Sequence, residues 1–332
     1  MTISDRSRGS GPAQQRGDDG GGVLVALTAD ASLVTRIRSA ADAATVQVYR
    51  DLESIDEAPE HVEALVGVRS PFDPRPWPRL RWVHAAAAGV DKLVTAEMAA
   101  SGATLTSSAG NGGVPLAEHA LMLMLMLDRD APRWMRAQRD RRWDRYRHGE
   151  LAGRSVVIVG MGAAGQALAA MAAACQMRVI AITRTGGREI PGVERNVRAN
   201  QLAIEAATAD FLVVAAPSTT ATQGLVGTTI LDALPSHAHV VCVSRGGIVD
   251  EQALVARLQD GRLAGAGLDA FETEPLPADS PLWAMPNVVV TPHNGATTEA
   301  TTRRGELILI DNIERFVTGR PLRNVVDLAA GY

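Results

Sequence analysis

Lysine is almost absent from this 332-residue chain: Lys92 is the only one, and arginines supply the other basic side chains. A phosphate-binding loop of the Gly-Lys-Ser/Thr type is therefore excluded, and Schiff-base catalysis would have to rest on Lys92 alone. The formal net charge is −4, and no run of basic residues offers a face for nucleic acid. We expect no nucleic-acid partner.

Cysteine and long apolar runs are scarce as well. Cys175 and Cys242 stand in apolar segments without the spacing of metal ligands, which favours two buried thiols in a reducing compartment and no metal site. The longest uncharged apolar run, at 120–127, is far shorter than the roughly 20 residues that cross a bilayer. The first apolar stretch, at 23–27, follows a polar tail, unlike a signal peptide. We expect a cytoplasmic protein without a membrane partner.

Short apolar runs alternate with helical segments along the chain, which predicts an α/β fold with parallel sheets. Residues 1–22 have little to bury, and we expect a disordered tail there, or a translation start further along the chain. A second alternating series begins at 154, with near-continuous apolar strands of the kind that helices cover on both faces. Residues 114–142 predict long helices that Pro132 breaks or kinks, and a last helix is predicted at about 298–318.

A glycine-rich turn follows the predicted strand "SVVIV" and opens an alanine-rich helix. Gly160, Gly162 and Gly165 stand in the order G-x-G-x-x-G, which in this context is a dinucleotide-binding fingerprint. Gly160 permits the tight turn, Gly162 lets the backbone approach a pyrophosphate, and Gly165 lets helix and strand pack closely. The positive end of the helix then faces the phosphates.

The next predicted strand, "RVIAIT", ends in Thr183-Arg184-Thr185 rather than in an acidic residue. A carboxylate there would bind the ribose 2′-hydroxyl of NAD and repel a 2′-phosphate, whereas an arginine with hydroxyl groups would bind that phosphate. We therefore expect NADP to be preferred to NAD, with Arg184 as the determinant. Alternatively, Arg184 stacks on the adenine or lies in solvent, and NAD remains open as the cofactor.

Three more predicted strands of this series end in polar residues. Arg245 follows "HVVCVS", Glu274 follows "GLDAFET", and His293 follows "NVVVTP". Because the carboxyl ends of parallel strands share one edge of a sheet, we expect these three side chains to meet beside the nicotinamide. Arg245 would bind the carboxylate of a 2-oxo acid, His293 would supply a proton as hydride arrives, and Glu274 would stabilise the protonated imidazole. Taken singly, each residue has an ordinary structural explanation. Arg245 could form a surface ion pair, His293 could pack at a strand end, and Glu274 could be a solvated acid in a loop.

These ordered motifs resemble those of the D-isomer-specific 2-hydroxyacid dehydrogenases, which include glyoxylate/hydroxypyruvate reductases and phosphoglycerate dehydrogenases. The resemblance runs from Val23 to about Val326 and rests on "GMGAAG", "SRGGIVDEQAL", "GLDAFETEPLP" and "PLWAMPNVVVTPH", with "RWVHAAAAGVDKL" and "PLAEHAL" upstream. It implies two Rossmann-like doubly wound parallel-sheet domains. The substrate domain would be discontinuous, at 23–108 and 296–332, and the dinucleotide-binding domain would span 109–295. It also implies a homodimer, with the segment after Pro115 at the dimer contact.

The resemblance further implies individual site residues. The substrate would be bound by Ala88, Gly89, Val90, Arg245 and His293. The cofactor would be bound by Gly160, Met161, Gly162, Ala163, Ala164, Gly165, Thr183, Arg184, Thr185, Ala216, Pro217, Thr222, Val243, Ser244, Arg245, Asp269, His293 and Gly295. Ala88, Gly89 and Val90 would offer backbone amides to the substrate carboxylate. Asp269 would contact the nicotinamide amide. Cys242 stands where relatives often have asparagine, so we expect one polar contact to be missing.

Three functions remain open on the sequence. The main prediction is NADP-preferring reduction of glyoxylate, hydroxypyruvate or a similar small 2-oxo acid. A runner-up is an NAD-linked dehydrogenase of a bulkier D-2-hydroxy acid. The third is a binding protein that uses the dinucleotide to control its assembly, against which the intact set of Arg245, Glu274 and His293 argues. The loops near 67–72 and 84–91, with Trp283 of a neighbouring chain, are expected to shape the substrate pocket.

Overall fold

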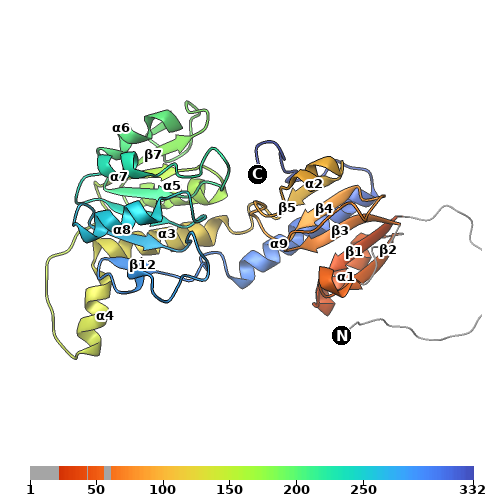
Figure 1. Ribbon diagram of the computed structural model, residues 1–332, viewed down its shortest axis with the longest axis horizontal. Helices are drawn as coiled ribbons and strands as arrows, with labels where there is room; N and C mark the ends of the chain where they lie inside the picture. Colours follow the sequence, from red (N-terminus) through yellow and green to blue (C-terminus); the bar gives the residue numbers. More distant parts are fainter. Residues whose placement is uncertain (1–21, 43, 56–60) are drawn as a thin grey trace, which may run out of the picture. The chain divides into compact units, whose positions relative to one another are not determined.

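The computed structural model describes residues 22–42, 44–55 and 61–332 (Figure 1). Contacts within the chain divide it into two compact units. One holds the described residues up to Asn111 together with Thr302–Tyr332, and the other holds Gly112–Thr301. The disordered tail expected at 1–22 lies outside the described residues, apart from Gly22. No helix in the described part of the chain has the length and apolar character needed to span a membrane.

The first unit is built on a parallel sheet in the order β2-β1-β3-β4-β5. Side chains alternate between the two faces, so that Leu24 packs toward Leu309 of α9 while Val25 packs in the cluster of Met98 of α2. The elements of this unit are β1 (Val23–Leu27), α1 (Ala31–Ala40), β2 (Thr45–Tyr49), η1 (Leu52–Ser54), β3 (Val62–Val68), β4 (Trp82–Ala85), α2 (Ala96–Ala100), β5 (Thr104–Ser107) and, from Thr302 onward, α9 (Glu299–Val317).

The second unit is built on a larger parallel sheet in the order β12-β11-β10-β9-β6-β7-β8. Its strands are β6 (Ser155–Val159), β7 (Arg178–Thr183), β8 (Arg195–Arg198), β9 (Phe211–Val214), β10 (His239–Cys242), β11 (Gly265–Leu268) and β12 (Val288–Val290). Its helices are α3 (Gly113–Asp128), α4 (Ala131–Arg139), α5 (Ala163–Ala174), η2 (Ala199–Gln201), α6 (Leu202–Ala206), α7 (Thr228–Ala233), α8 (Glu251–Gln259) and η3 (Pro281–Trp283).

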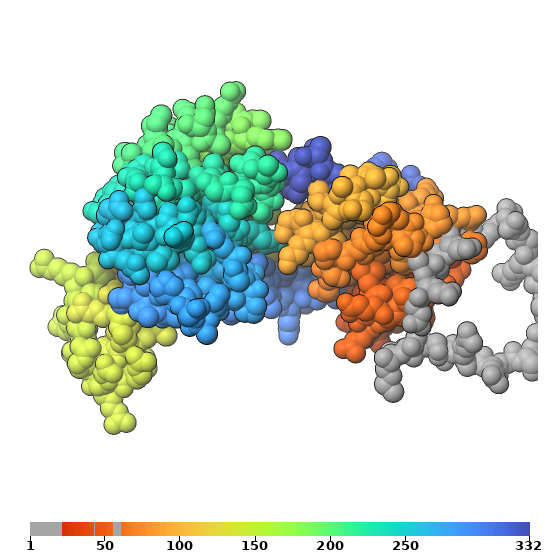
Figure 2. Space-filling model, viewed as in Figure 1, coloured from red at the N-terminus to blue at the C-terminus, as the bar shows by residue number. Residues whose placement is uncertain are grey.

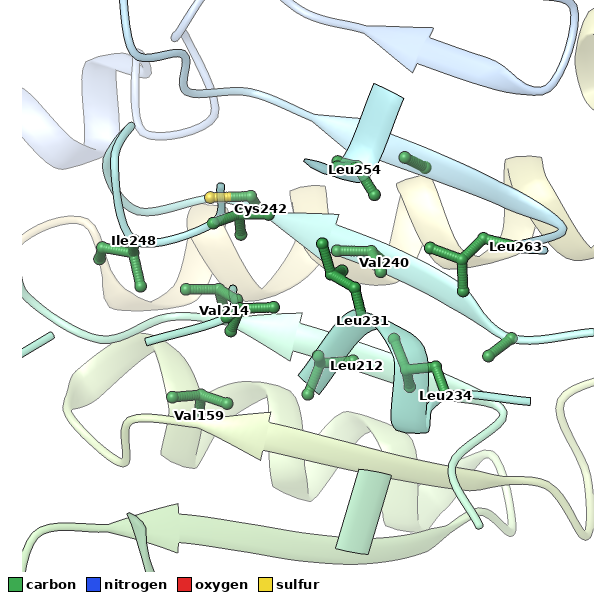
Figure 3. Packing of buried hydrophobic residues seen from close by; sticks show 14 of the residues in the cluster. Val159, Leu212, Val214, Leu231, Leu234, Val240, Cys242, Ile248, Leu254 and Leu263 are labelled. Atoms are coloured by element: carbon green, nitrogen blue, oxygen red, sulfur yellow. The ribbon is translucent and has the colours of Figure 1, made fainter. Parts of the chain in front are cut away.

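Helices cover both faces of this second sheet. Val156 packs on one face with Leu123 of α3 and residues of α5, whereas Val159 packs on the other face in the cluster of α6, α7 and α8. Figure 3 shows that second cluster, with Leu231 of α7 and Leu254 of α8 gathered over the strands. Strands buried on both faces need apolar side chains at successive positions, which explains their continuous apolar sequence. The predicted α/β class with two doubly wound parallel sheets is confirmed.

The helical segment predicted at 114–142 forms α3 and α4, which the residues Arg129 and Asp130 separate. Asp130 has a φ of 49°, in the left-handed region that interrupts a helix. Pro132 lies in the first turn of α4, where its missing N–H removes no helical hydrogen bond. The expected break at Pro132 is confirmed: without an N–H, Pro132 cannot donate to the carbonyl oxygen of Asp128, where α3 ends, and it lies in the first turn of the next helix.

Candidate active site

The strand order places the three expected catalytic residues after three adjacent strands. Arg245 follows β10, Glu274 follows β11 and His293 follows β12, and these strands are neighbours in the sheet. They also end at the same level, because Cys242 pairs with Leu268 and Leu268 pairs with Val290. The three loops therefore begin along one edge of the second unit.

His293 is hydrogen-bonded to Glu274 across two of these loops. Its Nδ1 atom lies 2.8 Å from Oε1 and 2.9 Å from Oε2 of Glu274, whose Oε1 also accepts the N–H of Phe271 at 3.0 Å. An ionised carboxylate only accepts hydrogen bonds, so Nδ1 carries a proton and Nε2 is the atom that exchanges one. The two side chains are 36% and 37% exposed, which leaves the imidazole accessible to a small molecule.

The buried carboxylate of Asp269 holds the chain on both sides of His293. Oδ1 accepts the hydroxyl of Thr291 at 2.7 Å and the N–H of Asn294 at 3.1 Å, while Oδ2 accepts the N–H of Gly295 at 2.9 Å. Asp269 is fully buried. These bonds fix the His293 loop to the end of β11. The expected contact of Asp269 with a nicotinamide amide stays a prediction.

His119 of α3 joins this network, and the sequence reasoning did not select it. Its Nε2 atom lies 2.9 Å from Oγ1 of Thr291 and 3.5 Å from Oδ1 of Asp269. The only signal was its place in the motif "PLAEHAL". A helix that covers the sheet thus braces the segment that carries His293.

Arg245 is half-buried at the end of the β10 loop. Its Nη1 donates to the carbonyl oxygen of Ser244 at 2.9 Å, and its own carbonyl oxygen accepts the S–H of Cys242 at 3.6 Å. Burial raises the pKa of the Cys242 thiol, so this sulfur remains a neutral donor. Cys242, at the position where a polar contact was expected to be missing, thereby makes one polar contact with the backbone. The hydroxyl of Ser244 is buried without a hydrogen-bond partner among the described residues.

The glycine turn between β6 and α5 has the shape that a dinucleotide requires. Gly160 has a φ of 95°, and a Cβ there would lie 2.6 Å from the Cα of Ala216. A Cβ on Gly165 would lie 2.0 Å from the carbonyl oxygen of Gly160. A Cβ on Gly162 would meet nothing within 4 Å, and α5 begins there without a side-chain cap. Open space beside uncapped helix N–H groups fits a pyrophosphate.

The end of β7 is an ordered turn. Thr183 donates its hydroxyl to Oδ1 of Asn196 at 2.7 Å and accepts the N–H of Gly186 at 3.0 Å, whereas Arg184 and Thr185 are exposed. The remaining expected cofactor residues lie along the same edge, in the glycine turn and in the loops after β9, β10 and β12: Met161, Ala163, Ala164, Ala216, Pro217, Thr222, Val243 and Gly295.

The expected substrate loop lies in the first unit, directly after β4. Ala88 and Gly89 are exposed, and Val90 is buried. The loop is tied to the segment after β5, because the N–H of Ser108 donates to the carbonyl oxygen of Ala87 at 3.1 Å. Among the residues that the structure describes, no group of three or more His, Cys, Asp or Glu side chains could hold a metal ion.

Comparison with known proteins supplies the family. The model for the D-isomer specific 2-hydroxyacid dehydrogenase, NAD binding domain, matches residues 121–295, which is just over half of the chain. The chain belongs to the D-isomer specific 2-hydroxyacid dehydrogenase family. This confirms the family that the motifs indicated.

Relatives of this dehydrogenase-family chain carry two kinds of name. The D-3-phosphoglycerate dehydrogenase of Archaeoglobus fulgidus is 31% identical over 258 residues, which cover 75% of this chain and 47% of the relative. The chain spans about half the length of the curated relatives that it matches. A solved NADPH-dependent glyoxylate/hydroxypyruvate reductase of Sinorhizobium meliloti, in complex with NADP and sulfate, is 29% identical with a TM-score of 0.81, covering 94% of this chain and 100% of that one.

A third relative is a solved structure of the family itself. The D-isomer specific 2-hydroxyacid dehydrogenase of Xanthobacter autotrophicus Py2, in complex with NADPH and MES, is 34% identical with a TM-score of 0.83. The alignment covers 94% of this chain and 100% of that one. The structural likeness therefore extends beyond the matched dinucleotide domain to 94% of this chain.

Proposed function

We propose that this protein is an NAD(P)-dependent oxidoreductase that interconverts a small 2-oxo acid of the glyoxylate or hydroxypyruvate type with its D-2-hydroxy acid. The observation that carries the proposal is the His293–Glu274 pair, with Nδ1 and Oε1 2.8 Å apart. It stands on the same sheet edge as a glycine turn shaped for a dinucleotide. Reduction of a carbonyl needs a hydride and a proton, and this edge offers a place for each source.

The bound dinucleotide would supply or accept the hydride. The chain's own residues would handle the proton and the substrate charge. His293, protonated at both ring nitrogens, would donate its Nε2 proton to the carbonyl oxygen during reduction and recover it during oxidation. Glu274 would keep Nδ1 protonated and balance the positive charge of the imidazolium, as a carboxylate does for a catalytic histidine. Asp269 would keep the loop of His293 in position.

Arg245 would bind the substrate carboxylate. A guanidinium offers two parallel N–H groups that match the two oxygens of a carboxylate, and Arg245 is half-buried, which strengthens such a contact.

The cofactor of this proposal is NADP in preference to NAD. The end of β7 carries no acid, and Arg184 is exposed there beside Thr183 and Thr185. A guanidinium at this position would attract a 2′-phosphate, whereas the 2′-hydroxyl of NAD would find no carboxylate. The two solved family members compared above were crystallised with NADPH or NADP.

The assembly of this proposal is a homodimer. Large exposed apolar side chains of the second unit concentrate in the segment from α3 to just beyond α4: Val114, Met122, Leu125, Trp134, Met135 and Trp143. In Figures 1 and 2 the part of this segment around α4 stands out from the body of the second unit. An apolar surface of this kind is typical of a contact between copies of a chain.

Initial rates test the proposed reaction. We would compare NADPH with NADH, each against hydroxypyruvate, glyoxylate, pyruvate and a bulky aryl 2-oxo acid. We expect turnover of the small acids, at a rate at least tenfold higher with NADPH than with NADH. This factor corresponds to about 1.4 kcal/mol at the transition state. Preference for NADH would overturn the preference for NADP and leave the proposed reaction standing. Absence of turnover with every acid would overturn the enzymatic proposal and favour a dinucleotide-binding protein.

A further inference from the structure

The edge strand β8 brings a second arginine to the carboxyl end of β7. Arg198 is the last residue of β8 and pairs directly with Thr183, the last residue of β7. Arg184 is the next residue after that pair. Two guanidinium groups therefore start from neighbouring strand ends, on the edge of the sheet where the glycine turn also lies.

Arg198 is oriented toward the Arg184 turn by contacts that hold the stem of its side chain. Its Nε donates to the carbonyl oxygen of Thr185 at 2.9 Å. Gly186, with a φ of 65°, makes room for the stem, because a Cβ at Gly186 would lie 2.9 Å from Cγ of Arg198. The hydrogen bond uses Nε and leaves the two terminal nitrogens for another acceptor.

That acceptor is not a carboxylate of the residues that the structure describes. Within the described residues, Arg198 forms no salt bridge, although several arginines on the same unit do: Arg195 pairs with Glu205 at 2.8 Å, and Arg257 pairs with Asp232 at 3.0 Å. The side chain is exposed, so a ligand can reach it. An arginine held at its Nε, without an acidic partner and at the ribose end of a dinucleotide site, suits a phosphate.

We propose that Arg198 and Arg184 together bind the 2′-phosphate of NADP, so that Arg198 is a second determinant of cofactor specificity. The inference rests on the proposed function, since it assumes that a dinucleotide occupies the glycine turn. The sequence around Arg184 already points to NADP. Arg198 lies fourteen positions further along and reaches the same place only through the pairing of β7 with β8.

Binding measurements separate this role from catalysis. NADPH and NADH would be titrated by fluorescence, and 2′,5′-ADP by calorimetry, against the wild-type protein, Arg198→Ala and Arg198→Lys. Arg178→Ala is the matched control, because Arg178 is exposed at the opposite end of β7. We expect Arg198→Ala to weaken the binding of NADPH and of 2′,5′-ADP by about tenfold, as loss of a charged hydrogen-bond donor does. The affinity for NADH should stay within twofold of the wild-type value. Arg198→Lys should recover part of the loss, and Arg178→Ala should match the wild type.

Three results would overturn the proposal. Equal weakening of NADPH and NADH would show that Arg198 only shapes the turn through Thr185 or stacks on the adenine. Unchanged NADPH affinity, or a wild-type protein that binds NADH as tightly as NADPH, would show that Arg198 does not bind the 2′-phosphate. A protein without turnover of any 2-oxo acid would contradict the proposed reaction but would leave this binding comparison fully readable.

Discussion

The carboxylate of Glu274 is bound to Nδ1 of His293 at 2.8 Å, and this pair connects the loops after two adjacent strands, β11 and β12. Nineteen positions separate the two residues in sequence. Because the carboxylate occupies Nδ1, the other ring nitrogen, Nε2, is the one that can exchange a proton with a substrate. We therefore expect acid–base chemistry at Nε2, on the side of the imidazole ring away from Glu274.

Replacing Glu274 with glutamine should lower kcat by about 10-fold to 100-fold, which is part of the roughly 10²-fold to 10⁴-fold that general acid–base catalysis contributes. Glutamine preserves the shape but removes the negative charge that balances an imidazolium. Initial rates with hydroxypyruvate measure this effect, with Glu272→Gln in the same loop as the control. An unchanged kcat would contradict the role of Glu274.

Two glycines of the same turn should respond differently to alanine. A Cβ at Gly162 meets no atom within 4 Å, so Gly162→Ala should fold normally but bind NADPH at least tenfold more weakly, because the methyl group obstructs the pyrophosphate. A Cβ at Gly165 would lie 2.0 Å from a backbone oxygen. Gly165→Ala should therefore lower the free energy of unfolding by about 1–3 kcal/mol. Thermal unfolding and NADPH titration of both variants check this. Normal NADPH binding by Gly162→Ala would argue against a dinucleotide in this turn.

Most of the fold could be predicted because buried parallel strands carry continuous apolar sequence. Runs of this kind coincide with β6, β7, β9, β10, β11 and β12. β5 and β8 escaped prediction. β5 has the sequence "TLTS", and β8 has the sequence "RNVR". β8 also lies at the edge of its sheet, where it pairs with only one neighbouring strand. Neither short, polar segment has an apolar pattern strong enough to detect.

The site was predictable where its residues follow such strands, and not where a contact depends on tertiary packing. The meeting of His293 with Glu274 follows from strand order, which a βαβ pattern indicates. The contact of His119 with Thr291 depends on how α3 crosses the sheet, which no local pattern encodes. Arg198 belongs to the same class, since its approach to Thr185 requires the pairing of an edge strand that the sequence did not reveal.

Two buried histidines should make the protein less stable in mild acid. Burial lowers the pKa of His84 to about 4 from an ordinary 6.5, and burial, helped by Arg154 and His237, does the same to His239. The unfolded chain therefore binds more protons between pH 6.5 and 4, and the free energy of unfolding falls as the pH falls through this window. His84→Gln should reduce the loss of unfolding free energy between pH 7 and pH 4.5 by about 2 kcal/mol.

Chemical denaturation at the two pH values tests this, and His61→Gln is the matched control because His61 is exposed. The control should show the same loss of stability as the wild type. A His84→Gln protein that loses as much stability as the wild type would show that His84 does not take up its proton on unfolding.

The apolar surface on α3 predicts a dimer that a single charge can weaken. Leu125→Glu places a carboxylate in the exposed set that includes Met122 and Trp134, so it should raise the dimer dissociation constant at least tenfold. Ile204→Glu is the matched control, because Ile204 is 68% exposed on α6, outside that set. Sedimentation analysis at several concentrations measures both variants. A monomeric wild type, or equal weakening by both substitutions, would contradict the proposed interface.

The central claim is that His293 is the proton donor of a 2-oxo acid reductase. His293→Ala removes the imidazole but leaves the Asp269 bonds to the backbone of Asn294 and Gly295 available. The most direct measurement compares the rate of NADPH oxidation with hydroxypyruvate, and the affinity for NADPH, in this variant and the wild type. The account predicts a loss of about 10²-fold to 10⁴-fold in kcat, with cofactor affinity within threefold of the wild type. A variant that retains more than a tenth of the wild-type rate would contradict it.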